Sequence, residues 1–257
     1  MRIVVKVGTS TLAYPTGNLN LRHMENLCRV LADLKNAGHQ IILVSSGAIG
    51  VGVGKLSLPG RPEDIPTKQA ASAVGQCELM NVYDQEFLKY SHVVGQILLT
   101  GDDIHSPERL TNFQNTLERL LSLGALPILN ENDSVSTSEI EIGDNDTLGA
   151  VVATSCHADL LILLSDIDGL YTADPRKDPN ATPIAQVRDI TPEIFALAGG
   201  KGSTLGTGGM QTKIGAAQIC REAGIDTIIA DGARPELLYG ILDGEPFGTR
   251  FIAEQNA

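Results

Sequence analysis

Tryptophan is absent from the sequence, and aromatic residues of all kinds make up only 4% of its 257 positions. Any hydrophobic core must therefore be built from aliphatic side chains. These are plentiful, because hydrophobic residues reach 42% and charged residues 19%, a composition typical of globular proteins. A chain of this length can bury roughly three quarters of its unfolded surface, so it needs no disulfide or metal cross-links.

Paired cysteines and clustered histidines are also missing. The four cysteines show no CxxC spacing, and the five histidines include no HExxH motif. Neither a zinc site nor a redox pair is supported, and free thiols fit a reducing compartment. No apolar run approaches the ~20 residues of a membrane span, and the first run ends at Lys6, too early for a signal peptide. We therefore expect a cytoplasmic protein that does not enter a membrane.

Positive charge is scarce, with 19 Lys and Arg residues against 31 Asp and Glu residues and a formal net charge of -12. Nucleic-acid backbones are bound by clustered lysine and arginine, so we expect no nucleic-acid partner. A nucleotide such as ATP needs only two or three well-placed cations together with Mg²⁺, and the net charge does not argue against it.

Short apolar runs alternate with amphipathic segments along the chain. The candidate strands are Arg2–Val7, Gln40–Val44, Val93–Leu99, Leu126–Leu129, Leu160–Leu164 and Thr227–Ala230. The candidate helices are Leu21–Ala37, Pro66 to about Lys89, Ser106 to about Gly124, Thr147–Cys156 and Gly209–Ala223. This alternation predicts an α/β fold with a mostly parallel sheet, whose ligands lie beyond the carboxyl ends of the strands. Lys55–Pro66 is predicted to be an exposed loop or hairpin, and Asp166–Pro183 a long ordered excursion.

A lysine interrupts the first apolar strand. A charge at such a position is costly unless it has a partner or a task, which makes Lys6 a candidate functional residue. Gly8 follows closely, and a glycine there allows backbone N–H groups to approach phosphate oxygens. The alternative is a lysine on an edge strand that extends its ammonium group into solvent.

The second strand is followed by Ser45, Ser46 and Gly47. Such a turn can present N–H and O–H donors to an anion, although it also fits a flexible glycine turn. The glycines that follow do not form GxGxxG, and the lone Gly54–Lys55 pair is not a Walker A loop. Dinucleotide-binding and P-loop folds therefore lose support.

Acidic and amide side chains gather in two further segments, Asn130–Asp133 and Gly143–Asp146. Together they are typical of a site that holds an amine or a metal ion. Each of the residues Asp144, Asn145 and Asp146 also fits a helix N-cap. Ser165 and Asp166 leave the most apolar strand in the chain, where the alternative is a capped turn.

Glycines and hydroxyl residues lead into the last predicted helix over Gly206–Lys213. Backbone N–H groups at a helix N-terminus favour an anion, and Lys213, one turn inside, adds a point charge suited to phosphate. The alternative is a loop that requires only flexibility.

These segments together resemble the amino acid kinase superfamily, and the resemblance runs from Arg2 to about Arg250. The residues that carry it are Lys6–Ser10, Ser45–Ala48, Asn130–Asp133, Gly143–Asp146, Ser165–Tyr171 and Thr207–Lys213. The resemblance implies a three-layer α/β/α sandwich forming a single domain over residues 1–257. Residues 1 to about 150 are expected to hold the acceptor substrate, and about 151–257 to hold ATP.

Within the superfamily, the two acidic and amide segments resemble members that phosphorylate the γ-carboxylate of L-glutamate with ATP, the first step of proline biosynthesis. The resemblance implies that Lys6 and Lys213 neutralise the phosphoryl group and that Asp146 orients both lysines. The substrate-binding residues implied are Ser46, Asp133 and Asn145. The ATP-binding residues implied are Lys6, Gly8, Gly47, Ser165, Asp166, Thr207, Gly208, Gly209, Met210, Gln211, Thr212 and Lys213. Mg²⁺ is expected to accompany ATP, with no protein residue assigned as its ligand.

A carboxylate acceptor is already ionised at neutral pH, so this chemistry requires no general base. It requires positioning and neutralisation of charge. Two alternatives stay open: another kinase of the superfamily, such as one acting on acetylglutamate or aspartate, and a non-catalytic module that senses amino acids. The resemblance also implies a homo-oligomer, either a dimer or a tetramer, and feedback inhibition by proline. Many bacterial members carry a C-terminal PUA domain, which we do not expect here because the sequence ends at Ala257.

Overall fold

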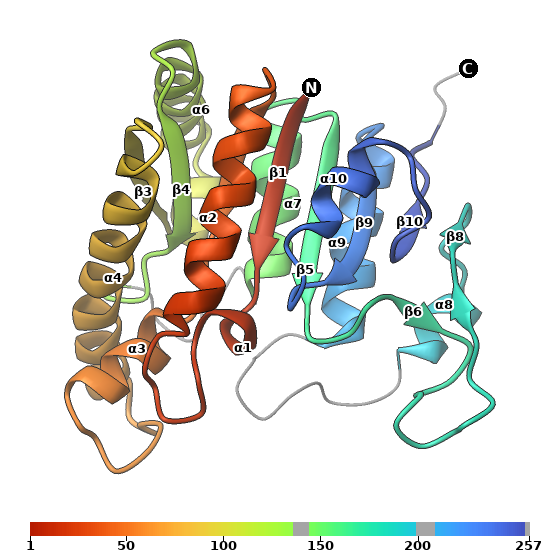
Figure 1. The fold of residues 1–257 in the computed structure, drawn as a ribbon, viewed down its shortest axis with the longest axis horizontal. Coiled ribbons are helices and arrows are strands. Elements are labelled where there is room, and N and C mark those ends of the chain that lie inside the picture. The colour runs from red at the N-terminus through yellow and green to blue at the C-terminus, as the bar shows by residue number, and fades with distance from the viewer. Residues whose placement is uncertain (136–143, 199–208, 255–257) are drawn as a thin grey trace.

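One eight-stranded sheet organises the molecule, with strand order β3-β4-β2-β1-β5-β9-β10-β8 (Figure 1). The computed structural model describes residues 1–135, 144–198 and 209–254. The strands of this sheet are β1 (Arg2–Val7), β2 (Gln40–Val44), β3 (Val94–Leu99), β4 (Leu126–Glu131), β5 (Leu160–Ser165), β8 (Gln186–Val187), β9 (Asp226–Asp231) and β10 (Thr249–Phe251). Neighbouring strands pair in parallel, except that β10 runs antiparallel to β9. The mostly parallel sheet that the sequence predicts is therefore confirmed.

The helices connect these strands, and a small antiparallel pair follows β5. The helices are α1 (Thr9–Leu12), α2 (Leu21–Asn36), α3 (Ala48–Lys55), α4 (Ile65–Leu88), α5 (Gly101–His105), α6 (Pro107–Ser122), α7 (Asn145–Ser155), α8 (Pro192–Leu197), α9 (Met210–Glu222) and α10 (Leu237–Leu242). The small pair consists of β6 (Leu170–Tyr171) and β7 (Pro183–Ile184). No helix among the described residues is both long and apolar enough to cross a membrane.

Two hydrophobic cores lie on opposite faces of the sheet, because successive strand residues point to opposite sides. On β1, Ile3 and Val5 pack into the core that α2, α4 and α10 cover. Val4 packs into the second core, with α6, α7 and α9. In Figure 1 the first set of helices lies in front of the sheet and the second set behind it. The three-layer α/β/α sandwich is therefore confirmed.

The register of β1 decides the surroundings of Lys6. This strand pairs with β2 on one side and β5 on the other, so it is central, and the edge-strand interpretation of Lys6 is wrong. Lys6 lies on the same face as Val4, and its stem packs near Gly149 of α7, while the residue as a whole is buried. Its ammonium group must therefore find its partners inside the protein.

The predicted strands and helices all occur, with ends shifted by one or two residues at most. The flexible-turn interpretation of the glycines after Ser46 is wrong, because Gly47 is the N-cap of α3 and the glycines that follow lie within this helix. Gly47 adopts φ +91°, which lets the chain turn sharply from β2 into this helix. Gly52 lets α3 and α4 pack closely, since a Cβ atom there would lie 1.8 Å from the carbonyl oxygen of Ala71.

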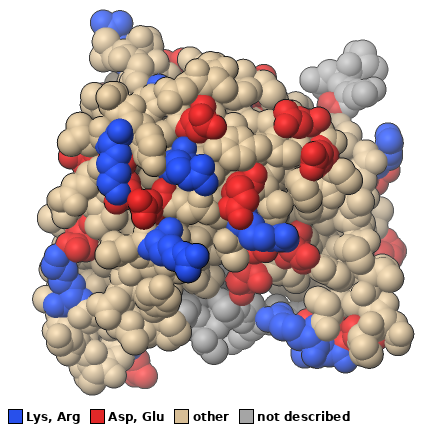
Figure 2. Space-filling view, in the orientation of Figure 1, with Lys and Arg blue, Asp and Glu red and all other residues tan. Residues whose placement is uncertain are grey.

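The surface over α2, α4 and α10 carries charges of both signs. Figure 2 shows Lys and Arg side chains lying beside Asp and Glu side chains on this face. Lys89, for example, forms ion pairs with Glu25 at 3.7 Å and Glu86 at 2.7 Å, and Arg234 pairs with Asp231 at 2.9 Å. Such interspersed charge differs from the clustered lysine and arginine of a nucleic-acid interface.

Candidate functional site

Two adjacent cavities open where the parallel strands β1, β2, β4 and β5 end. The larger has a volume of about 760 Å³ and is lined by residues that include Gly8 and Ser46. The smaller has a volume of about 330 Å³. Ser165, Asp166 and Lys213 line both cavities, so a ligand in one can reach a ligand in the other. Both volumes are in the usual range for small-molecule sites.

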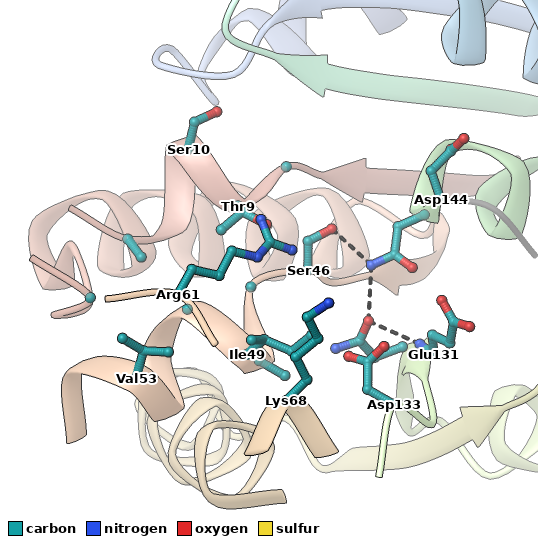
Figure 3. A pocket seen from close by; sticks show the side chains of 18 of the residues that line it. Thr9, Ser10, Ser46, Ile49, Val53, Arg61, Lys68, Glu131, Asp133 and Asp144 are labelled. Carbon is teal, nitrogen blue, oxygen red and sulfur yellow. Dashed lines mark hydrogen bonds between the residues drawn. The ribbon is translucent and has the colours of Figure 1, made fainter. Parts of the chain in front are cut away.

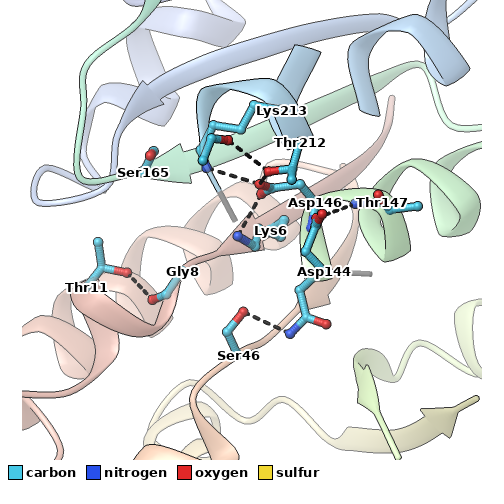
Figure 4. A network of polar contacts seen from close by, with 12 residues as sticks. Lys6, Gly8, Thr11, Ser46, Asp144, Asp146, Thr147, Ser165, Thr212 and Lys213 are labelled. Carbon is cyan, nitrogen blue, oxygen red and sulfur yellow. Dashed lines mark hydrogen bonds and ion pairs between the residues drawn. The ribbon is translucent and has the colours of Figure 1, made fainter. Parts of the chain in front are cut away.

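A buried ion-paired cluster lies where the cavities meet (Figure 4). Lys6 Nζ is 2.7 Å from Asp146 Oδ1, and Lys213 Nζ is 3.0 Å from Asp146 Oδ2. The hydroxyl of Thr212 lies 2.8 Å from the same Oδ2 atom. The structure therefore brings together the three residues that the sequence resemblance assigns to phosphoryl transfer.

Burial makes this cluster electrostatically strong. Asp146 is 0% exposed, Lys6 7% and Lys213 6%. Burial alone raises the pKa of the Asp146 carboxyl, but the ammonium groups of Lys6 and Lys213 outweigh it and lower that pKa to about 2. One carboxylate beside two ammonium groups leaves an excess positive charge facing the cavities. Charge fixed in this way, away from bulk water, can stabilise an anionic group that forms beside it.

Asp144 and Asp146 have different tasks at the start of α7. Asp144 is the N-cap, and its Oδ1 atom accepts hydrogen bonds from the backbone N–H groups of Asp146 at 2.7 Å and Thr147 at 2.9 Å. Burial and the nearby charge of Asp146 raise the pKa of the Asp144 carboxyl. The helix-cap interpretation is therefore correct for Asp144. Its hydrogen bonds fix the first turn from which Asp146 reaches the two lysines.

The amide of Asn145 ties β2 to the end of β4. Its Nδ2 atom lies 2.8 Å from the carbonyl oxygen of Ser45, 2.9 Å from Ser46 Oγ and 2.9 Å from Asn130 Oδ1. Ser46, Asn145 and Asp133, the three predicted substrate-binding residues, all line the larger cavity. Figure 3 shows Ser46 and Asp133 in this position. The described structure thus gathers them on one wall, next to the ion-paired cluster.

The sequence reasoning missed the face of α4 that supports this wall. Ser72 Oγ donates to Asp133 Oδ2 at 3.2 Å, and Gln76 Oε1 accepts from Asn130 Nδ2 at 2.8 Å. Ser72 and Gln76 are buried and four positions apart, so they lie on the same face of the helix. The sequence does contain a sign of this role, because the two polar residues occupy positions of the helix where the spacing predicts buried, apolar side chains.

The predicted ATP-binding residues do not all line the same cavity. Gly209 and Met210 line the smaller cavity, and Gly8 and Gly47 line the larger one. Gln211 and Thr212 line neither: Gln211 is exposed, and Thr212 contacts Asp146. Thr207 and Gly208 lie outside the described residues. The apolar walls of the smaller cavity come from the predicted Met210 together with Leu170, Tyr171, Ala173, Pro175 and Leu197, of which Leu197 lies outside every segment that the sequence analysis singled out.

Solved structures share this fold at low sequence identity. Carbamate kinase from Giardia lamblia bound to AMP-PNP superposes with a TM-score of 0.71 at 14% identity, covering 98% of each chain. UMP kinase from Bacillus anthracis gives 0.67 at 13%, covering 99% of this chain and 96% of that one. The T. acidophilum isopentenyl phosphate kinase product complex gives 0.66 at 17%, covering 98% and 100%. At these identities the likeness shows the fold alone.

Curated proteins are much more similar in sequence. Glutamate 5-kinase of Clostridium perfringens is 53% identical over 258 residues, which cover 99% of this chain and 96% of that protein. Glutamate 5-kinase of Clostridium acetobutylicum is 54% identical over 251 residues, covering 98% and 94%. The model of the amino acid kinase family matches residues 1–231. Because this model and these relatives cover most of the sequence, the chain belongs to the amino acid kinase family.

Proposed function

We propose that this protein transfers the γ-phosphoryl group of ATP to the γ-carboxylate of L-glutamate, forming L-glutamyl 5-phosphate and ADP, the first step of proline biosynthesis. The observation that carries the proposal is the buried Lys6–Asp146–Lys213 cluster at the junction of two cavities. A phosphoryl group crossing between two bound substrates passes through such a junction. The likeness to glutamate 5-kinases over nearly the whole chain supports glutamate as the acceptor.

The reaction is an in-line displacement at phosphorus. An oxygen of the γ-carboxylate forms the new P–O bond, and the bond to the β,γ-bridging oxygen breaks, so that ADP leaves with the electron pair. The acceptor is ionised at neutral pH and no proton has to be removed. Catalysis therefore rests on alignment and on neutralising charge on the transferring group, which is the task of Lys6 and Lys213. Asp146 holds both ammonium groups in place.

We assign glutamate to the larger cavity and ATP to the smaller one. Ser46, Asp133 and Asn145 line the larger cavity and offer hydroxyl, carboxylate and amide groups to an amino acid. The apolar walls of the smaller cavity suit an adenine ring, and α9 begins at its edge, where helix N–H groups favour phosphate. The assignment of Thr207 and Gly208 to ATP binding rests on sequence alone.

Mg²⁺ fits this site as a companion of ATP. No group of three or more His, Cys, Asp or Glu side chains among the described residues could hold a metal ion by itself. Protein-bound Mg²⁺ commonly uses phosphate oxygens, water and only one or two carboxylates. Asp144 and Asp166 line the larger cavity and could supply a carboxylate. The ion would neutralise phosphate charge when bound.

Release of ADP, combined with hydroxylamine trapping of the acyl phosphate, tests the proposal. Glutamate, acetylglutamate, aspartate and carbamate are offered in turn with MgATP, and we expect ADP release and hydroxamate with glutamate. A different preferred acceptor would indicate another kinase of the family. Binding of glutamate without ADP release would indicate a sensing module, and no hydroxamate above background contradicts the proposal.

The family resemblance also supports a homo-oligomer and inhibition by proline. Light scattering coupled to size-exclusion chromatography measures the first, and a mass of about one chain contradicts it. Titration of proline into the ADP-release assay measures the second, and an unchanged rate at saturating proline contradicts it.

A further inference from the structure

A further lysine, Lys68, reaches into the larger cavity. Lys68 belongs to the first part of α4 and lines the cavity together with Ser46 and Asp133. In Figure 3 its side chain extends from α4 toward the space that these two residues also face. Lys68 is half-buried, so its stem is packed while its ammonium group can meet a ligand.

On its own helix Lys68 interacts with the charge of the exposed N-cap Asp64, but the two side chains form no ion pair. Lys68 lies at the start of α4, which Asp64 caps by accepting a hydrogen bond from the backbone N–H of Thr67 at 2.9 Å. The N-terminal end of a helix carries positive partial charge, so a cation is disfavoured there. Within the described parts of the chain, no carboxylate lies within 4.0 Å of the Lys68 ammonium group. A ligand anion is therefore a fitting partner.

The charges of L-glutamate indicate which anionic group is the partner of Lys68. At neutral pH the molecule carries two carboxylates and one ammonium group. Its γ-carboxylate must meet the phosphoryl group beside Lys6 and Lys213, and Asp133 offers a carboxylate to the ammonium group. The α-carboxylate is left, and a charge placed in a cavity away from water requires a counter-charge. We propose that the Lys68 ammonium group binds the α-carboxylate of L-glutamate, an inference that rests on the proposed function.

This contact makes Lys68 a specificity residue. In this arrangement Lys68 holds the α-carboxylate of the bound glutamate, and the γ-carboxylate meets the phosphoryl group beside Lys6 and Lys213. The acceptor must span the interval between them. Aspartate, with one methylene group fewer, leaves its side-chain carboxylate one carbon–carbon bond short of phosphorus. Misplacement of this size costs about 100-fold in rate, so the two anchored ends select for length.

The test combines Lys68→Met with the α-amide of L-glutamate, which keeps the γ-carboxylate but loses the α charge. For the wild type, replacing glutamate by its α-amide should lower kcat/KM about 10- to 100-fold, the usual cost of losing a charged hydrogen bond. Lys68→Met should lower kcat/KM for glutamate by a similar factor, mainly through KM, and leave the KM for ATP unchanged. It should leave kcat/KM for the α-amide nearly unchanged, and Lys68→Arg should recover part of the loss with glutamate.

Lys89→Met is the matched control. Lys89 lies just after the other end of α4, roughly 30 Å away along the helix, and is exposed. It should behave as the wild type does with both substrates. Circular dichroism and thermal melting check that each variant is folded.

Several results would overturn the inference. Wild-type kinetics in Lys68→Met would do so, as would equal losses for glutamate and its α-amide, which would indicate a purely structural effect. A loss specific to the α-carboxylate in Arg61→Met but not in Lys68→Met would move the assignment to Arg61, which lines the same cavity. Failure of the proposed function is distinct, because the wild type would then give no hydroxamate with glutamate.

Discussion

Asp146 contacts both buried lysines, and each of its carboxylate oxygens serves one of them. This arrangement fixes two ammonium groups that would otherwise repel each other. It also means that the three side chains depend on one another, so substitutions within the cluster are not expected to be additive. Substitutions of single residues in this cluster can therefore separate effects on activity from effects on stability.

Removing either ammonium group should abolish most of the activity while preserving the fold. Lys6→Met and Lys213→Met keep the packed stem of the lysine and remove its charge. Each should lower kcat on the order of 10²–10³-fold, the usual cost of losing one group that stabilises developing charge. Steady-state ADP release measures the effect, with Lys89→Met as control. Near-normal turnover in both variants would refute the assigned role.

Asp146 should make stability depend on acid pH. Its pKa is 3.8 in the unfolded chain and falls to about 2 in the folded protein. A lowered pKa stabilises the fold above the unfolded value, and that contribution disappears as pH falls through the folded value. Near neutral pH the free energy of unfolding should therefore be higher for the wild type than for Asp146→Asn. The difference should be about 3–5 kcal/mol, because the variant leaves two buried ammonium groups unpaired.

Urea denaturation at a series of pH values measures this difference. The difference in free energy of unfolding between wild type and Asp146→Asn should become smaller as pH is lowered from about 5 toward 2. Asp84→Asn, an exposed carboxylate on α4, is the control and should change little. Parallel stability curves for wild type and Asp146→Asn would contradict the pKa assigned to Asp146.

Among the helices, the contact of α3 with α4 depends on glycine. A Cβ atom on Gly52 would lie 1.8 Å from the Ala71 carbonyl oxygen, and one on Gly75 would lie 1.8 Å from that of Ala48. The two backbones therefore touch directly. This contact keeps the start of α3, beside Ser46, close to the α4 residues that support Asp133.

Gly52→Ala should force these helices apart. We expect a loss of about 1–3 kcal/mol in the free energy of unfolding, the usual cost of overpacking, together with a raised KM for glutamate. Gly215→Ala is the matched control, because a Cβ atom there meets nothing within 4 Å and alanine favours a helix. Denaturant titrations compare the two. Equal stability in both variants would show that the helices can separate at little cost.

For the whole molecule, the sequence reveals the long elements and only part of the site. Leu160–Ser165 is readable as a strand because it is apolar throughout. Sequence reasoning missed two short elements, Gln186–Val187 and Pro192–Leu197, because neither is long enough to show a periodic pattern of apolar residues. Lys6 is conspicuous as a charge within an apolar run. Its pairing with Asp146 came from family resemblance, because no local pattern links a strand residue to a distant helix.

The central place of β1 has a consequence for how the chain folds. Ile3 pairs with Ile41 on one side and with Leu160 on the other, so β1 can pair with β2 soon after both are synthesised but with β5 only much later. Contacts of such long sequence separation slow folding, because loop closure must precede them. The larger cavity acquires Lys213 only with α9. A ribosome-bound chain therefore cannot assemble the phosphoryl-transfer site until α9 has been synthesised and has left the ribosome.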